Sequence, residues 1–274
     1  MQTAKCVLEI DLGIEPLGER PSMELNGKVI LVTGGGSGIG AATCRLLGKA
    51  GAQVIVADRA GARAEAVAAD IPGAWGVVVD VVDAAACEAM VEGIRERFGR
   101  LDGAFNNAGI TEVTALGGAP IPETHALPLE VWRKVLSVDL DGVFNCLRAE
   151  IPLMLASGGG AIVNTTSLQA HISYPRTAAY TAAKHGVLGL TKAIAKEYGE
   201  QGIRCNSVSP GVVDTPLTAG VIHSPQYKDM LLAPIPLKRF ATPEDIAKAA
   251  LWLLSDESAY INGATLAADG GYLA

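Results

Sequence analysis

Short apolar runs alternate with longer helical patterns from Gly27 onward, and this alternation narrows the possible folds more than any other feature of the chain. Seven runs predict strands, at residues 28–33, 53–58, 75–80, 103–107, 160–167, 203–210 and 264–269. The segments between them predict helices at 39–50, 60–70, 83–98, 130–156, 178–199 and 243–255. Because the first, second, third and fifth runs are almost continuously apolar, their strands are expected to be covered on both faces. The pattern therefore predicts an α/β fold, a doubly wound parallel seven-stranded sheet with helices on both faces.

Length and composition indicate one domain. A chain of 274 residues that is 49% hydrophobic fits one large domain or at most two, and no shift in composition marks a boundary. We expect a tail at residues 1–23 and a single domain at 24–274. The N-terminal segment contains several acidic residues and no long apolar run, unlike a secretory signal.

Charge and cysteine usage exclude several classes of function. A net charge of −7 disfavours binding to nucleic acid or to an anionic membrane surface. The chain has no run of about 18 uncharged apolar residues, so no membrane-spanning helix is expected. Its five cysteines are scattered without a C-x-x-C pair, which predicts neither a disulfide framework nor a metal site. The reducing cytoplasm is the compartment that fits best.

A glycine-rich turn, TGGGSGIG at residues 33–40, joins the first strand to the first helix. Glycines at 34, 38 and 40 allow a tight turn and let a pyrophosphate approach the free N–H groups at the helix N-terminus. Tight packing alone would also favour glycine here, so the turn needs support from other residues.

Acidic residues end the second and third strands. Asp58 can accept hydrogen bonds from the ribose hydroxyls of an adenosine and would repel a 2′-phosphate, which favours NAD over NADP. Arg59 is interpreted as a solvated or adenine-facing side chain. Asp80 and Val81 would offer a polar and an apolar contact to the adenine. Taken singly, either aspartate could equally be a helix cap or a turn residue.

Several separate motifs together resemble the short-chain dehydrogenase/reductase family, in its single-domain branch. They are the TGxxxGxG turn, NNAG at 106–109, YTAAK at 180–184 with Ser167 thirteen residues earlier, PGVVDTP at 210–216 and DGG at 269–271. The likeness runs from Leu25 to Tyr272 and implies a Rossmann-type, NAD-binding and catalytic domain. Residues implied to bind the cofactor are Gly34, Ser37, Gly38, Ile39, Gly40, Asp58, Arg59, Asp80, Val81, Asn107, Ala108, Gly109, Tyr180, Lys184, Pro210, Gly211, Val213 and Thr215.

Tyr180 and Lys184 lie one helical turn apart and so face the same way. Lowering a tyrosine pKa from about 10 to about 7 takes roughly 4 kcal/mol, and one cation about 4 Å away at an effective dielectric near 20 supplies that scale. We expect Tyr180 to transfer the proton and Lys184 to lower its pKa. The resemblance implies that Lys184 also holds the nicotinamide ribose and that Ser167 orients the substrate oxygen. A buried tyrosine beside a snorkelling lysine is the structural alternative.

Asp139 departs from the family pattern, which more often has asparagine at this place. The family uses the backbone carbonyl there to hold a water that links the lysine to solvent, a role that survives the substitution. A carboxylate near Lys184 would offset part of the field that lowers the Tyr180 pKa, or would itself be partly protonated. We therefore count Asp139 with the catalytic residues and expect a higher pH optimum than an asparagine version would show.

The substrate side is less defined. The resemblance implies substrate contacts from Ser167, Gln169, His171 and Tyr180, whereas His185 points away from Lys184 and is interpreted as structural. The resemblance implies that residues 214–238 form a substrate lid, and their apolar content favours a small hydrophobic alcohol or ketone. In the family, the helices predicted at 130–156 and 178–199 pair across a two-fold axis, usually within a homotetramer. The sequence itself supports only their apolar faces, part of which packing on the sheet explains.

These features predict an NAD(H)-dependent oxidoreductase that interconverts a secondary alcohol and a ketone, with Tyr180 as acid/base. A 3-oxoacyl thioester reductase is a second hypothesis, although Asp58 and the acidic composition disfavour it. A catalytically silent NAD-binding sensor is a third, disfavoured by the intact Ser167, Tyr180 and Lys184.

Overall fold

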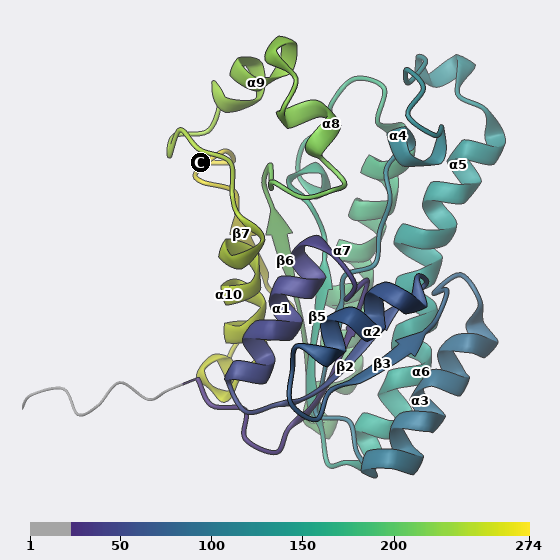
Figure 1. Cartoon of the computed structure of the whole chain (residues 1–274), viewed down its shortest axis with the longest axis vertical. Coiled ribbons are helices and arrows are strands. Elements are labelled where there is room, and N and C mark those ends of the chain that lie inside the picture. Colours follow the sequence, from purple (N-terminus) through teal and green to yellow (C-terminus); the bar gives the residue numbers. More distant parts are fainter. Residues whose placement is uncertain (1–22) are drawn as a thin grey trace, which may run out of the picture.

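The computed structural model describes residues 23–274, in which seven parallel strands form one sheet (Figure 1). The strands are β1 (Val29–Thr33), β2 (Gln53–Asp58), β3 (Trp75–Val78), β4 (Gly103–Asn106), β5 (Gly160–Thr165), β6 (Ile203–Pro210) and β7 (Thr265–Ala268). Their order is β3-β2-β1-β4-β5-β6-β7, so the chain reverses its direction of growth between β1 and β4. The predicted fold class is confirmed. The tail predicted at 1–23 lies, except for Met23, outside the described residues.

Alternate residues of each strand enter two separate cores. Val29 and Leu31 of β1 pack with α3 (Ala84–Phe98), α6 (Gly142–Ala156) and α7 (Ala178–Tyr198). Ile30 and Val32 pack on the other face with α1 (Gly38–Lys49), α2 (Gly61–Ala69) and α10 (Pro243–Leu254). Successive side chains of a strand point to opposite faces of the sheet, and here both faces are covered by helices. The β1 and β2 sequences are therefore unbroken apolar runs.

The carboxyl ends of the strands carry the shorter elements, which lie towards the top of Figure 1. They include α4 (Glu112–Ala115), α5 (Leu129–Leu136), α8 (Ala219–Ile222) and α9 (Pro225–Leu232). Single 3₁₀ turns span Thr124–Ala126, Leu168–Ala170, Gly199–Gln201 and Asp256–Ser258. In open sheets of this kind, ligands bind at the carboxyl ends beside the point where the strand order reverses.

The helix predicted at 130–156 is not continuous. A π-helical turn, Ser137–Asp141, separates α5 from α6. The apolar pattern runs through the turn without a break, which is why the sequence suggested one helix. Such turns often lie at functional sites, and this one contains Asp139.

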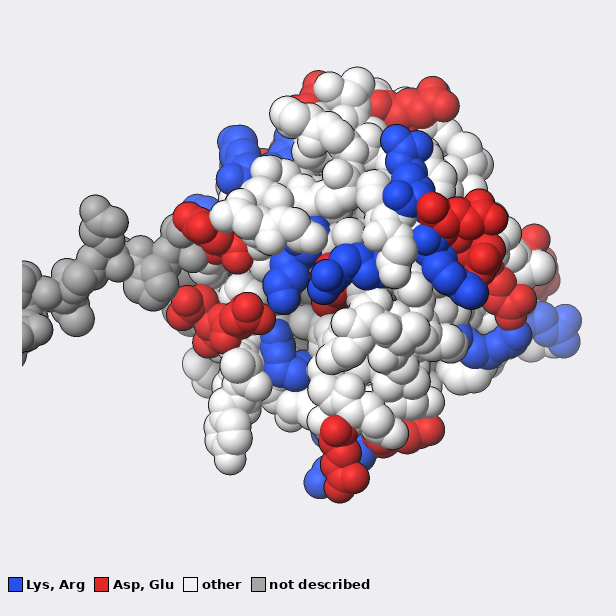
Figure 2. All heavy atoms as spheres, turned by 90° about the horizontal axis from the view of Figure 1, so that it is seen from below, with Lys and Arg blue, Asp and Glu red and all other residues white. Residues whose placement is uncertain are grey.

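Acidic and basic side chains are interleaved on the end of the molecule opposite α8 and α9, which Figure 2 shows. Arg100 and Asp102 form one such pair there, at the amino end of β4. Within residues 23–274, no helix combines the length and the apolar character needed to cross a membrane.

Glu150 of α6 is fully buried in the protein interior. Its Oε2 accepts a hydrogen bond from Asn106 Nδ2 at 3.1 Å, and its Oε1 has no partner within the described part of the chain. Burial raises its pKa from 4.5 to about 7, with Asn106 opposing the rise. The folded protein therefore holds this proton at pH values where the unfolded chain has released it.

We expect Glu150→Gln to remove this pH dependence. Between its unfolded and folded pKa values the folded state binds more protons, so the stability of the wild type falls as pH rises. The variant should match the wild type near pH 4 and exceed it by up to roughly 3 kcal/mol above pH 8. Thermal unfolding across this range measures the difference, with the exposed Glu96→Gln as control. Equal gains at both ends of the range would contradict the assignment.

Candidate active site

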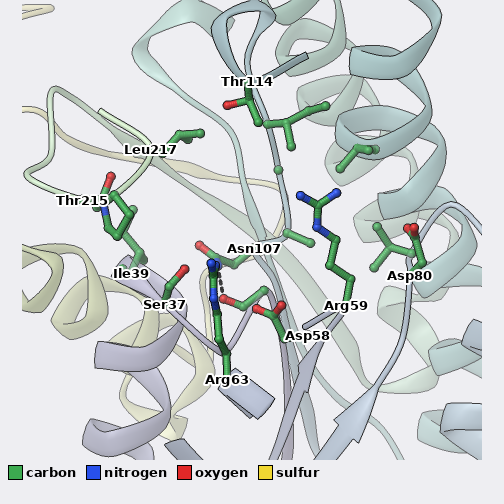
Figure 3. A pocket seen from close by; sticks show the side chains of 18 of the residues that line it. Ser37, Ile39, Asp58, Arg59, Arg63, Asp80, Asn107, Thr114, Thr215 and Leu217 are labelled. Atoms are coloured by element: carbon green, nitrogen blue, oxygen red, sulfur yellow. Dashed lines mark hydrogen bonds between the residues drawn. The ribbon is translucent and has the colours of Figure 1, made fainter. Parts of the chain in front are cut away.

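A cavity of about 400 Å³ opens at the carboxyl ends of β1, β2 and β4, a size that suits a nucleotide (Figure 3). Its walls come from the glycine turn, the ends of β2 and β3, the NNAG segment with the residues that follow it, the π turn and residues 215–217. They are Gly34, Ser37, Gly38, Ile39, Asp58, Arg59, Arg63, Val79, Asp80, Val81, Asn107, Ala108, Gly109, Ile110, Thr114, Val138, Thr215, Pro216 and Leu217.

The glycine turn is packed too tightly for side chains. Gly34 has φ +63°, and a Cβ there would lie 2.9 Å from Cα of Ala108. A Cβ on Gly40 would lie 2.2 Å from the Gly34 carbonyl oxygen. Gly38 has φ +51° and faces Thr215, whose side chain would be 3.3 Å from an added Cβ. The turn thus holds β1, the end of β4 and Thr215 close to the N-terminus of α1.

Asp58 shapes one end of the cavity. Its Oδ2 accepts a hydrogen bond from the Gly36 amide at 3.0 Å, and its Oδ1 accepts one from the Ala60 amide at 2.9 Å. Figure 3 shows Arg59 and Arg63 on either side of this carboxylate. Arg63, on α2, is a wall residue for which no sequence motif gives a signal.

The cavity brings together twelve of the residues predicted to bind the cofactor, from Gly34 to Thr215. Those outside its walls are Gly40, Tyr180, Lys184, Pro210, Gly211 and Val213. Pro210 and Gly211 instead pack against β7, where a Cβ on Gly211 would lie 2.7 Å from Cα of Asp269. Val213 is buried and pairs its backbone with Ala241. The walls that sequence reasoning did not find are Arg63, Val79, Ile110, Thr114, Val138, Pro216 and Leu217.

Lys184 lies almost completely buried on α7, with only 3% of its side chain exposed. Its Nζ donates to the Thr165 carbonyl oxygen at 3.0 Å and lies 3.1 Å from Asp139 Oδ2. The same atom is 5.4 Å from the centre of the Tyr180 ring. The structure therefore places the predicted cation beside the predicted acid/base.

Asp139 is held in place by the NNAG segment. Its Oδ1 accepts a hydrogen bond from the Ile110 amide at 2.7 Å, and its side chain is fully buried. A Cβ on Gly109 would lie 2.9 Å from Asp139 Oδ2, so a glycine is needed there for the carboxylate to fit. The π turn, the NNAG segment and α7 meet at this ion pair.

Burial and charge act against each other in this cluster. Burial raises the pKa of Tyr180; Lys184 and the hydrogen bond with Ser167 lower it, Asp139 and Glu112 raise it, and the net direction is upward. Lys184 thus acts in the expected direction, but burial outweighs it. Burial lowers the pKa of Lys184, yet Asp139 and Tyr180 raise it by more. Burial also raises the pKa of Asp139, against the effect of Lys184 and the Ile110 amide.

Glu112, at the start of α4, is a further member of the cluster that sequence reasoning did not find. It is buried, and its Oε1 accepts a hydrogen bond from the Tyr180 amide at 2.9 Å. A glutamate in the first turn of a helix is ordinary, so the sequence contains no signal for this contact.

The predicted substrate residues lie around Ser167. The Ser167 hydroxyl accepts a hydrogen bond from the Gln169 amide at 3.2 Å. The Gln169 side-chain oxygen is occupied by the hydroxyls of Thr177 and Thr181, at 2.6 and 3.1 Å. His171 is exposed just after this segment.

Comparison with known proteins finds a family model and relatives that match most of the chain. A family model described as enoyl-(acyl carrier protein) reductase matches residues 34–273. Cyclohexanol dehydrogenase of Acinetobacter sp. (strain SE19) is 40% identical over 256 residues, which cover 92% of this chain and 97% of that protein. D-threitol dehydrogenase of Mycolicibacterium smegmatis is 42% identical over 252 residues, which cover 90% of this chain and 94% of that protein.

A solved structure of a candidate NAD(P)-dependent gluconate 5-dehydrogenase from Beutenbergia cavernae, with bound NADP at low occupancy, superposes with a TM-score of 0.84. It is 35% identical, and the match covers 92% of this chain and 99% of that one. The parallel sheet, the glycine turn, Tyr180 beside the buried Lys184 and these relatives lead to one conclusion: the chain belongs to the short-chain dehydrogenase/reductase family of nicotinamide-dependent oxidoreductases.

Proposed function

We propose that the protein interconverts a small hydrophobic secondary alcohol and its ketone with NAD(H), and that Tyr180 exchanges the hydroxyl proton. The observation that carries the proposal is Tyr180 beside the buried Lys184 and Asp139, next to a cavity of nucleotide size. The cyclohexanol and threitol dehydrogenases among the relatives support an alcohol as substrate.

The residues present fit a dinucleotide. The positive φ at Gly34 and Gly38, and the Cβ clashes there, describe a turn shaped for close backbone approach. This turn and Ser37 would hold the pyrophosphate, Asp58 the adenosine ribose, and Asp80 with Val81 the adenine. Val213 and Thr215 would hold the nicotinamide carboxamide, and Lys184 the nicotinamide ribose. A bound nicotinamide would supply the hydride acceptor or donor for the reaction.

The protein's own task is to position the substrate and move one proton. Ser167 orients the substrate oxygen, and Tyr180 takes the proton during oxidation or returns it during reduction. Lys184 favours the tyrosinate form, and the positive charge of an oxidised nicotinamide would act in the same direction. Asp139 opposes both, which sets the pH at which the tyrosinate becomes available.

The adenosine end supports NAD rather than NADP. A 2′-phosphate would be repelled by Asp58, whose two oxygens are fixed by backbone amides. Arg59 and Arg63 line the same cavity and would favour a phosphate, so the preference depends on Asp58. One charge contact of this kind corresponds to roughly a tenfold or larger ratio.

Residues 214–238 are proposed as the substrate lid. They contain α8 and α9, and Leu217, Met230 and Leu237 are exposed apolar side chains there. This composition supports a small hydrophobic alcohol or ketone, with Gln169 and His171 at the pocket edge.

A homotetramer is proposed through α6 and α7. Val143, Leu147 and Val187 are buried in the core of this chain. Phe144 on α6 remains half exposed and is available for contact with another subunit. Light scattering measures the assembly. Within residues 23–274, the cysteines are buried free thiols, namely Cys44, Cys87, Cys146 and Cys205, and they support the cytoplasm as compartment.

The central test is a panel of alcohols and ketones with NAD(H) and NADP(H), followed by the absorbance of the reduced nicotinamide. We expect turnover of cyclic secondary alcohols and a kcat/KM for NAD+ at least about tenfold above that for NADP+. Asp58→Ala should raise kcat/KM for NADP+, because Arg59 and Arg63 remain, whereas the exposed Asp70→Ala should not. Turnover of 3-oxoacyl thioesters alone would favour the second hypothesis, and tight NAD binding without any turnover would favour the sensor.

A further inference from the structure

The first turn of α7 is capped from outside its own sequence. The early N–H groups of a helix lack intrahelical acceptors and need other partners. Thr177 stands at the N-cap, but its side chain makes no cap hydrogen bond. Its hydroxyl instead contacts Gln169 Oε1 at 2.6 Å and the Tyr174 carbonyl oxygen at 2.9 Å. The amide of Tyr180, third residue of the helix, donates to Glu112 Oε1 at 2.9 Å.

Glu112 is an unusual choice for a purely structural cap. Only 1% of the residue is exposed, and its Oε2 has no hydrogen-bond partner among residues 23–274. Burial raises its pKa, the amides of Tyr180, Glu112 and Ala179 oppose the rise, and Asp139 adds to it. A buried carboxylate with a free oxygen costs stability that a neutral cap would not.

The contact joins two parts of the site. Glu112 follows the NNAG segment by three residues, and the Ile110 amide between them holds Asp139. Tyr180 itself packs against Ile110, Val135 and Ala179. One short stretch of chain therefore fixes the amide of the acid/base residue and also the carboxylate that pairs with Lys184.

We propose that Glu112 is a positioning residue, which caps α7 across the site and holds Tyr180 in register for proton transfer. The inference rests on the proposed function of Tyr180. The charge of Glu112 also affects the pKa of Tyr180. The charged and titratable groups that act on Tyr180 are Lys184 on α7, Asp139 in the π turn and Glu112 on α4, together with the Ser167 hydroxyl. Removing the Glu112 charge should make the tyrosinate easier to form.

Two variants separate the cap from the charge. Glu112→Gln keeps an acceptor for the Tyr180 amide and removes the charge, whereas Glu112→Ala removes both. We expect Glu112→Gln to retain kcat within about threefold and to move the pH–rate profile of alcohol oxidation about half a pH unit lower. Glu112→Ala should lower kcat by about tenfold or more, with little change in the KM for NAD+, because Tyr180 loses its register. The exposed Glu130→Ala on α5 is the matched control.

A second measurement does not depend on turnover. The ultraviolet absorbance of tyrosinate, taken as the difference between each chain and its Tyr180→Phe counterpart, follows Tyr180 directly in the free protein and with NAD+. Glu112→Gln should shift this titration downward even if no substrate is found, so a failure of the proposed reaction stays distinguishable. An unmoved titration in Glu112→Gln, or an unchanged kcat in Glu112→Ala, would overturn the proposal.

Discussion

Tyr180→Phe is expected to lower kcat for alcohol oxidation by about 100-fold or more, the range that one positioned acid/base contributes. The substitution deletes only the hydroxyl. The ring should still pack against Ile110, Val135 and Ala179, so the fold and the nucleotide cavity should remain intact.

Steady-state kinetics and the fluorescence of bound NADH measure the two effects separately. We expect NADH affinity within about threefold of the wild type, since one contact to the nucleotide is lost at most. Tyr260→Phe is the matched control, because that side chain is fully exposed and does not line the cavity. A kcat for Tyr180→Phe within about tenfold of the wild type would assign the proton to another group.

Lys184→Met should cost both activity and stability. The variant leaves the fully buried Asp139 carboxylate without its cation, and breaking a buried ion pair in this way typically costs about 3–5 kcal/mol. Turnover should fall by about 100-fold or more, because the tyrosinate loses the cation that favours it. Denaturant unfolding at one fixed protein concentration measures the stability.

The pair Lys184→Met/Asp139→Asn completes the cycle. Removing both charges should recover more than half of the lost stability without recovering turnover. Asp139→Asn alone should move the pH–rate profile roughly one unit lower, because Asp139 raises the pKa of Tyr180. Superimposable profiles for Asp139→Asn and the wild type would remove Asp139 from the proton chemistry. Full additivity of the two stability losses would show that the pair is not coupled.

The fold was largely predictable because its strongest signal is local. Buried parallel strands require apolar residues on both faces, so the strand pattern is visible one segment at a time. The π turn at Ser137–Asp141 was not predictable, since the apolar periodicity continues across it. In residues 214–238, four prolines obscure the helical patterns of α8 and α9, although Pro225 begins α9 at the first helical position.

The site divides in the same way. Ser167, Tyr180 and Lys184 have a fixed spacing along the chain, and Asp139 has a fixed place in the family pattern, so the sequence marks all four as candidates. Glu112 instead contacts a segment 68 residues away, and no motif marks that contact. The burial of Glu112 and Asp139 arises only when β4, the π turn and α7 pack together. Arg63 of α2 is a similar case to Glu112, because no motif marks its place.

The close approach of Gly38 to Thr215 joins the glycine turn to the segment proposed as the substrate lid. Thr215, Pro216 and Leu217 also wall the nucleotide cavity. A coupling free energy between two ligands is reciprocal: whatever the nucleotide does to substrate affinity, the substrate does to nucleotide affinity. Because residues 215–217 line the cavity and also begin the proposed lid, a substitution among them is expected to change the dissociation constants of both ligands.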